Sequence, residues 1–468
     1  MNGETALGRF GDKRRARQGT ELLAAVRRKR TLCVRRLAED RQQERRFGEF
    51  LANPAVGTHE MLVTAGQRTN RCAAGRHVLA IMDTPDVLFP TQVTKKRGFG
   101  LGSDGKHPGL FLHPILAVDA ANGGVIGLVD CIVLNRTEGK LSSRKGKKRI
   151  QTHKTRAADD KESRRWLEGA RMAGHCLTGT SMTTMVCDRE ADINHLFAFR
   201  PDNVHLLVRS AQARALTTGG SLPAYCASLP ERARETVQVP AKAGQPAREA
   251  TVALRFGSVS LKRPAHSTDK DLPDAVSVWV VDVQEIDPPA GAEPVHWRLL
   301  TTHEVTTLAQ ARQIVAWYRM RWIIEQLFRS MKSHCLRIED SQLEDVGCFR
   351  KLAMIGLIAA IRAMQLVMAR DGSTDQPITD AADPADMPAL RAISASLEGR
   401  TETLKNPHDE SKLAWYAWIV ARQGGWSGYT SRGYRPPGPK TMHHGLLRLD
   451  PILAGWRLAE RSMDVRLH

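Results

Sequence analysis

The sequence predicts an α/β protein with two to four domains, and three observations support this. The chain has 468 residues, and single hydrophobic cores stop growing at about 250–300 residues. Hydrophobic residues make up 42% of the chain, which is enough for a folded globular protein rather than a disordered one. Short apolar runs typical of strands alternate with longer stretches that have helical periodicity.

Charge gives the first indication of a partner. Lys and Arg total 69 against 50 Asp and Glu, a net charge of +19. Such an excess attracts a polyanion, usually nucleic acid, with a membrane surface as the alternative. No run of about 18 apolar residues and no apolar export signal are recognised, so we expect no membrane partner. The 8 cysteines form no CxxC pair, which indicates reduced thiols in a cytoplasmic protein.

The first half of the chain is expected to form a sheet with helices. Two of its strands are joined by Asn122-Gly123-Gly124, a strong hairpin signal. Helices are expected over residues 161–173 and 189–199. The predicted strands cover residues 77–83, 110–119, 125–135, 183–188 and 204–210.

The sequence pattern changes in the second half of the chain. Short β-rich pieces dominate residues 211–304, which predicts an all-β insertion. Continuous helices are expected over 307–335 and 347–370. Residues 371–388 are rich in Asp, Pro and Thr, which is typical of a linker, and the rest of the chain is expected to be mixed helical.

Two segments are strongly basic. Residues 1–70 are expected to be helical, and their many arginines include Arg14 and Arg15 next to Lys13. The guanidinium fork grips phosphate oxygens in pairs, which favours DNA contact over a merely solvated helix surface. The loop 136–156 carries nine basic residues and one acid, and it is either a solvated loop or a second DNA contact.

Acidic residues stand where strands end. Asp83 and Asp188 each close an apolar run, so both side chains are expected at the rim of a sheet. A later helix can bring a third acid, Glu325, to the same place. Three clustered carboxylates repel one another and need a cation, and oxygen ligands suit Mg²⁺ or Mn²⁺. For any one acid alone, an N-cap or a surface salt bridge is the simpler explanation.

The segment 318–332 strengthens this hypothesis. On one ideal helix, Tyr318, Arg321, Glu325 and Lys332 project within about 60° of arc. An acid flanked by cations and a phenol suits phosphate chemistry. The alternative is an ordinary amphipathic helix in which Arg321 pairs with Glu325. The apolar sector expected to face the core contains Trp317, Met320, Ile324, Leu327, Phe328 and Met331.

These residues carry a resemblance to a known family. The pattern Tyr318-x2-Arg321-x3-Glu325-x6-Lys332 resembles the Tyr-Arg-Glu-Lys signature of the insertion-sequence-four (Tn-five-like) DDE transposases. The resemblance extends from about residue 10 to about residue 370. Other segments that are similar to the family, in the same order, are Gly11–Arg15, Phe50–Pro54, Leu79–Thr84, Lys161–Ser163 and Asp188–Asp192.

The resemblance implies a ribonuclease-H-like catalytic core, interrupted by the β insertion, with helical N-terminal DNA-binding and C-terminal domains. It implies that Asp83, Asp188 and Glu325 are the catalytic residues and hold two Mg²⁺ or Mn²⁺ ions. The residues that it implies for DNA contact are Tyr318, Arg321, Lys332, Arg209, Trp297, Lys13, Arg14 and Arg15. Trp297 would stack on a flipped base, although a core tryptophan is the simpler alternative.

The implied domains are a DNA-binding domain (1–70), two parts of the catalytic core (71–210 and 305–370) around the insertion (211–304), and a linker with a C-terminal dimerisation domain (371–468). Pro85 departs from the family pattern, and the C-terminal region does not match it.

The implied function is cut-and-paste transposition of a bacterial insertion sequence. A homodimer would bind the terminal inverted repeats, cleave them by two-metal hydrolysis through a hairpin, and join them to target DNA, in the cytoplasm at the nucleoid. A nuclease that cuts without joining is one alternative. A catalytically inactive or truncated DNA-binding inhibitor is another, because the chain begins close to the Gly11 motif.

Overall fold

The structure is a computed structural model with a mixed α/β fold. It describes residues 6–92, 95–136, 162–239, 246–265, 267, 269–334, 336–428 and 436–464. The basic loop expected at 136–156 lies outside these residues apart from Arg136. The chain divides into two compact units. Unit 1 comprises Met1–Arg76, Thr84–Lys140 and Ile323–His468, and unit 2 comprises His77–Asp83 and Leu141–Trp322.

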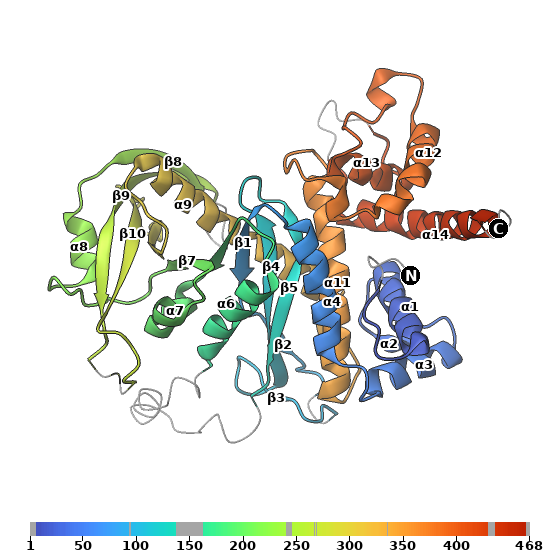
Figure 1. Ribbon diagram of the computed structural model, residues 1–468, viewed down its shortest axis with the longest axis horizontal. Helices are drawn as coiled ribbons and strands as arrows, with labels where there is room; N and C mark the ends of the chain where they lie inside the picture. The colour runs from blue at the N-terminus through green and yellow to red at the C-terminus, as the bar shows by residue number, and fades with distance from the viewer. Residues whose placement is uncertain are drawn as a thin grey trace. The chain divides into compact units, whose positions relative to one another are not determined.

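The core of unit 1 is built around one apolar helix, α11 (Val346–Ala369). By length and composition alone α11 could cross a membrane, although Arg362 and Gln365 interrupt its apolar sequence. Of the most apolar 18-residue stretch of α11, 72% is buried inside the protein. Helix α11 is therefore a core helix. It packs against α1 (Lys13–Lys29), α3 (Arg41–Ala52) and α4 (Thr58–Cys72), as Figure 1 shows.

Helix α1 is delimited by local sequence signals. The Asp12 side chain accepts a hydrogen bond from the Arg14 amide, which caps the first turn. Arg30 adopts left-handed backbone geometry (φ 50°) and ends the helix. One face of the helix is buried, and Lys13 and Arg14 are exposed. The short helix α2 (Val34–Leu37) connects α1 to α3.

The hairpin expected in the first half is confirmed. Strands β4 (Pro108–Asp119) and β5 (Val125–Leu134) pair antiparallel, and Gly123 takes the positive φ (75°) that the turn requires. Two short strands, β2 (Asp86–Leu88) and β3 (Gly100–Leu101), pair with β4. Helices α4 and α11 both pack against β5.

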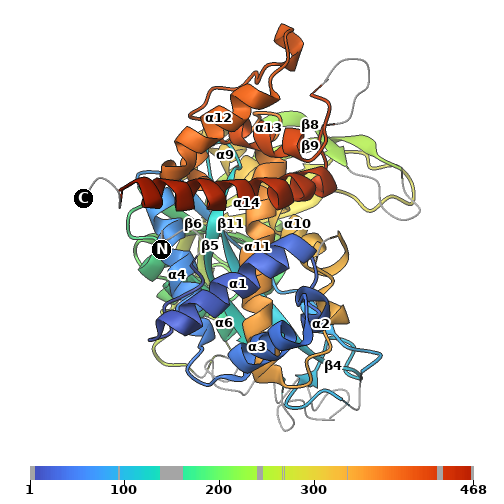
Figure 2. The same ribbon diagram turned by 90° about the vertical axis from the view of Figure 1, so that its right-hand side faces the viewer.

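The C-terminal part of unit 1 is helical. It contains α12 (Met387–Leu397), α13 (Leu413–Gln423) and α14 (Pro439–Asp464). Helix α13 is buried and contributes Trp415, Tyr416 and Trp418 to an apolar cluster. Figure 2 shows α14 passing across α11, and α14 contacts both α11 and α1.

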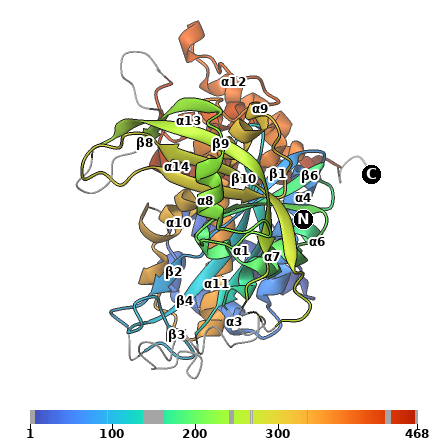
Figure 3. The same ribbon diagram turned by 90° about the vertical axis from the view of Figure 1, so that its left-hand side faces the viewer.

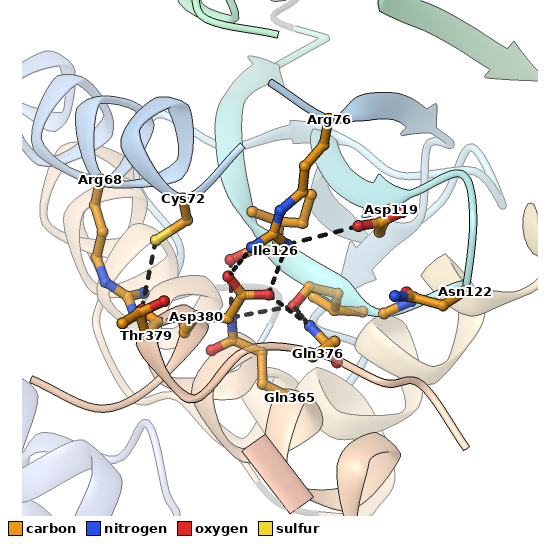
Figure 4. Close-up of polar contacts among 12 residues, drawn as sticks. Arg68, Cys72, Arg76, Asp119, Asn122, Ile126, Gln365, Gln376, Thr379 and Asp380 are labelled. Carbon is orange, nitrogen blue, oxygen red and sulfur yellow. Dashed lines mark hydrogen bonds and ion pairs between the residues drawn. The ribbon is translucent and has the colours of Figure 1, made fainter. Parts of the chain in front are cut away.

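Residues 371–388 are folded, contrary to the expectation of a linker. Asp380 is fully buried, and both of its carboxylate oxygens accept hydrogen bonds from Arg76 at 2.9 Å (Figure 4). Gln376 donates a further bond to Asp380 at 3.0 Å, and Gln365 donates to the Asp380 carbonyl at 3.0 Å. The composition suggested exposure, but these polar groups are buried because partners from distant parts of the chain satisfy them.

Unit 2 contains a sheet in the strand order β1-β6-β7-β11-β10-β9-β8. The first three strands are parallel and the following ones antiparallel. The β-rich segment thus extends the sheet beyond β7, and Figure 3 shows its strands β8, β9 and β10. The strands are β1 (His77–Met82), β6 (Met182–Cys187), β7 (Val204–Arg209), β8 (Ala233–Val239), β9 (Arg248–Lys262), β10 (Ala275–Glu285) and β11 (His296–Thr301).

The helices of unit 2 differ from expectation in two places. The segment 211–304 contains the short helix α8 (Leu222–Ser228), so it is not purely β. The helix expected over 189–199 is divided into a 3-10 turn and α7. The remaining helices are α6 (Arg164–Cys176), α7 (Asn194–Phe199) and α9 (Leu308–Met320).

The prediction of a continuous helix over 318–332 was wrong, because the helix is interrupted. Helix α9 ends at Met320, and α10 (Ile323–Arg329) begins after a turn at Arg321 and Trp322. Tyr318 and Arg321 are only 2% and 4% exposed. Their burial and the break remove the single polar stripe, because a rotation of 100° per residue does not extend through a turn. A π-helical turn over Ser330–His334 follows α10.

A cluster of three histidines lies within unit 2. Thr184 Oγ1 on β6 is 2.8 Å from Nε2 of both His77 and His303, and the rings of His303 and His205 stack 4.2 Å apart. Burial, together with the charges of His205, His77 and Arg200, lowers the pKa of His303 from 6.5 to about 3. The folded protein therefore resists protonation of His303, whereas the unfolded chain accepts a proton near pH 6.5.

The expected consequence is a pH-dependent contribution to stability. It is fully present above pH 6.5 and is lost as the pH falls towards 3, because the unfolded state then binds more protons. His303→Asn should flatten the decline in unfolding free energy across this window by roughly 1–3 kcal/mol. Urea unfolding at several pH values measures this. The exposed His59→Asn is the control, and an unchanged decline in His303→Asn would contradict the assignment.

Candidate active site

Asp83 and Asp188 lie at the ends of two neighbouring parallel strands. The register of β1 and β6 pairs Leu79 with Thr184 and Ile81 with Val186. Continued by two residues, it sets Asp83 opposite Asp188. Side chains alternate between faces with period two, so the two carboxylates emerge on the same face, where strands are about 4.8 Å apart.

Arg321 holds the first of these acids. Its Nη1 donates to Asp83 Oδ2 at 2.9 Å, and its side chain is only 5% exposed. Hydrogen bonds between ionised groups are stronger than neutral ones. Asp188 accepts a hydrogen bond from the Arg189 amide and so caps a 3-10 turn. Both acids are therefore oriented by the fold.

The pKa of the Cys187 thiol is affected by the charges of both Asp83 and Asp188. Burial raises the pKa of its thiol well above the ordinary value, and the charges of Asp83 and Asp188 raise it further, while Arg321 opposes them. Both carboxylates thus lie within electrostatic range of one buried sulfur. A thiol held neutral in this way is not a nucleophile.

Tyr318 links the acids to the other residues expected at the site. Burial raises the pKa of its phenol, as does the charge of Asp188, while Arg321 and a hydrogen bond with Arg209 oppose the shift. Its ring centroid lies 6.0 Å from that of the partly exposed Trp297 on β11. Unit 2 therefore brings together Asp83, Asp188, Arg209, Trp297, Tyr318 and Arg321.

The other expected site residues belong to unit 1. Glu325 lies in the first turn of α10 and is partly buried. Lys332 lies in the π-helical turn. Lys13 and Arg14 are exposed on the first turn of α1, and Arg15 donates to the Phe10 carbonyl.

The partners of Lys332 were not predicted. Its Nζ lies 3.0 Å from Asp86 Oδ1 and 3.2 Å from Glu339 Oε1. Burial acts to raise the pKa of Asp86, but hydrogen bonds from Ser103 and Lys332 outweigh it and lower the pKa. Glu339 has no signal in the sequence, because it comes into contact only through the turn after α10.

Asp192 has a structural role within the Asp188 motif. It is buried and accepts hydrogen bonds from Arg214 Nε at 2.7 Å and from the amides of Ala211 and Gln212. It therefore fixes the loop that follows β7. Sequence spacing alone could not distinguish this buried ion pair from a second catalytic acid.

The pair of acids suits a hard divalent cation. Carboxylate oxygens are the preferred ligands of Mg²⁺ and Mn²⁺. Each carboxylate offers about four lone-pair positions, so contact with one guanidinium nitrogen leaves capacity for a metal. Within the described part of the chain, no three His, Cys, Asp or Glu side chains form a cluster that could hold a metal ion. Asp83 and Asp188 are thus able to supply two ligands to such a site, and any further ligands would come from elsewhere.

Comparison with known families is consistent with this geometry. Residues 135–362 match the family model described as the transposase DDE domain. The matched segment contains Asp188, Tyr318 and Glu325, and Asp83 precedes it. The match supports a DDE transposase, which is a DNA-cleaving enzyme, and the mixed α/β fold with mostly antiparallel strand pairing is consistent with a ribonuclease-H-like core. DDE transposases generally use divalent metal ions.

Glu190 and Asp192 follow Asp188 in the chain, and substituting each in turn tests which of the two stabilises the fold. Asp192→Asn should lower the unfolding free energy by about 3–5 kcal/mol, because it leaves Arg214 buried without its counter-charge. Glu190→Gln is the matched control. That side chain is 68% exposed, and its partner Arg165 also donates to the Glu162 carbonyl, so the change should lower stability by less than about 1 kcal/mol. Chemical denaturation measures both, and equal effects would refute the structural role of Asp192.

Proposed function

We propose that this chain is a cut-and-paste DNA transposase of a bacterial insertion sequence. It would bind the terminal inverted repeats of its element, cleave them and join them to target DNA. The observation that supports this best is the placement of Asp83 opposite Asp188, beside Tyr318 and Trp297, in a chain that matches the transposase DDE domain.

In this proposal Glu325 is the third acid of the site. It follows Arg321, which holds Asp83, by four residues in the chain. Asp83, Asp188 and Glu325 would together hold two Mg²⁺ or Mn²⁺ ions. Such ions activate the attacking water or 3′-hydroxyl and stabilise the leaving oxygen in phosphodiester chemistry.

The surrounding residues would bind and orient the scissile phosphate. Arg321 offsets the charge of Asp83, which lets a polyanion approach two carboxylates. Tyr318 stays protonated and can donate a hydrogen bond to a phosphate oxygen, and Arg209 adds a second guanidinium beside it. Lys332 is held by two carboxylates and would exchange them for a phosphate when DNA binds.

Binding of the transposon end is assigned to the basic surface of residues 1–70, including Lys13, Arg14 and Arg15. These residues lie on the first turn of α1, where Lys13 and Arg14 are exposed. We assign dimerisation in the synaptic complex to residues 371–468. Two ends must be cut in concert, and twofold pairing of protomers supplies that geometry.

Trp297 is proposed to stack on a flipped base during hairpin formation. Its ring is partly exposed and packs against Tyr318. Trp297→Ala should slow hairpin formation more than the first nick, because stacking contributes about 1–3 kcal/mol per base and only the second step needs the base extruded. Single-turnover assays on a labelled transposon end separate the steps. Equal slowing of both would instead assign Trp297 to the core.

The catalytic assignment is tested by near-isosteric replacement. Asp83→Asn, Asp188→Asn and Glu325→Gln should each retain end binding but lose strand cleavage, because the negative charge that holds the metal is removed while packing changes little. Wild-type cleavage should require Mg²⁺ or Mn²⁺, and Ca²⁺ should support assembly with little chemistry.

Glu190→Gln is the matched control and should retain most of the activity, since its carboxylate is exposed and faces Arg165. Asp86 and Asp192 are unsuitable controls because their ion-paired carboxylates are only 21% and 0% exposed, whereas that of Glu190 is 68% exposed. Robust nicking by any of the three variants, or by the wild type in EDTA, would refute the metal mechanism.

A further inference from the structure

Asp282 is a buried acid on β10, next to the strand β11 that carries Trp297. Its side chain is 3% exposed, and the antiparallel register of the two strands pairs it with Arg298. Arg298 Nε donates to Asp282 Oδ1 at 3.1 Å, and His296 Nε2 lies 3.0 Å from the same oxygen. One buried carboxylate thus holds the residues on both sides of Trp297 in the chain.

Trp297 lies on the other face of β11. Successive side chains of a strand alternate between the two faces of a sheet, and His296 and Arg298 both contact Asp282. The Trp297 ring accordingly packs against Tyr318 of α9, with 6.0 Å between the ring centroids. The contacts of Asp282 therefore anchor β11 on one face and leave Trp297 on the face where Tyr318 lies.

The surroundings of Asp282 are closed to solvent. Cys226 of α8 is fully buried beside the same group. Burial and the charge of Asp282 raise the pKa of the Cys226 thiol to about 11, while Arg298 and Arg255 oppose the shift. Asp282 has almost no surface with which to contact DNA, so it can act only through the residues that it holds.

Backbone pairing supports Trp297 mainly from the β10 side. Pairing with β10 covers all of His296–Thr301. Pairing with β7 covers only Leu299–Thr301, and one further hydrogen bond, from the Ser210 amide to the Arg298 carbonyl at 2.7 Å, extends it by a residue. The Asp282 contacts thus reinforce β11 where its pairing with β7 ends.

We propose that Asp282 is a positioning residue that orients Trp297 for stacking on a flipped base. It acts through His296 and Arg298 and touches neither the base nor the scissile phosphate. This inference rests on the proposed function, in which Trp297 stacks on a base during hairpin formation. A stacking residue must be held by well-packed neighbours, and a misplacement of about 1 Å can cost up to about 100-fold in rate.

Asp282→Asn tests the proposal on two labelled transposon ends, one intact and one already nicked. The substitution is near-isosteric but removes the negative charge that holds Arg298 and His296. It should slow hairpin formation on the nicked end by roughly threefold to tenfold more than the first nick on the intact end. An unfolded fraction does not affect the ratio of the two rates, because both are measured on one preparation.

Asp269→Asn is the matched control. It removes a carboxylate that lies 2.7 Å from His195 Nε2, in a pair outside β10 and β11, and should leave the ratio unchanged. Should Asp282→Asn fail to fold, His296→Gln takes its place. The His296 side chain is 37% exposed, so its replacement disturbs the core less, and it should change the ratio in the same direction.

Combination with Trp297→Ala separates positioning from a general loss of stability. In that background Asp282→Asn should add little further slowing of hairpin formation, because the ring that it orients is absent. Equal slowing of both steps by Asp282→Asn, an unchanged ratio, or the same added slowing with and without Trp297 would overturn the positioning role. If Trp297→Ala itself formed hairpins at the wild-type rate, the stacking role would be refuted, and the positioning role with it.

Discussion

The candidate site depends on the parallel pairing of β1 with β6. Its register sets two carboxylates side by side at the ends of the strands, where their charges repel. Arg321 offsets part of this repulsion through Asp83, and Tyr318 adds a neutral phenol near Asp188. A shift of the register by one residue would send one of the two carboxylates to the opposite face. The sheet therefore determines whether a divalent cation can be held here at all.

In unit 1, charged and polar side chains are buried together with partners from distant parts of the chain. Asp380 and Arg76 form a buried ion pair, and it anchors a segment rich in Asp, Pro and Thr against the hairpin of β4 and β5. Breaking such a pair leaves an uncompensated charge, whereas the intact pair costs little.

Sequence patterns predicted the structure correctly where neighbouring residues in the chain determine it. Apolar runs predicted the strands that carry Asp83 and Asp188, and Asn122-Gly123 predicted the hairpin. Sequence patterns failed where contacts between distant parts of the chain determine the structure. The break at Arg321 and Trp322 and the burial of Tyr318 and Arg321 are not revealed by helical periodicity. The role of Asp192 depends on Arg214, and a partner 22 residues away leaves no signal in a local motif.

Of the candidate site, the sequence predicted Asp83 and Asp188 at strand ends, and in unit 2 they lie close to Arg209, Tyr318 and Arg321, with Trp297 against Tyr318. The roles of these residues in the site remain predictions. Glu325 and Lys332 remain predictions, as does the metal itself. The most direct measurement is anomalous diffraction from crystals of the full-length protein grown with Mn²⁺ and transposon-end DNA. The account predicts manganese between the carboxylates of Asp83 and Asp188, with Glu325 as a further ligand. Manganese bound elsewhere, or a well-ordered Asp83 and Asp188 without it, would contradict the account.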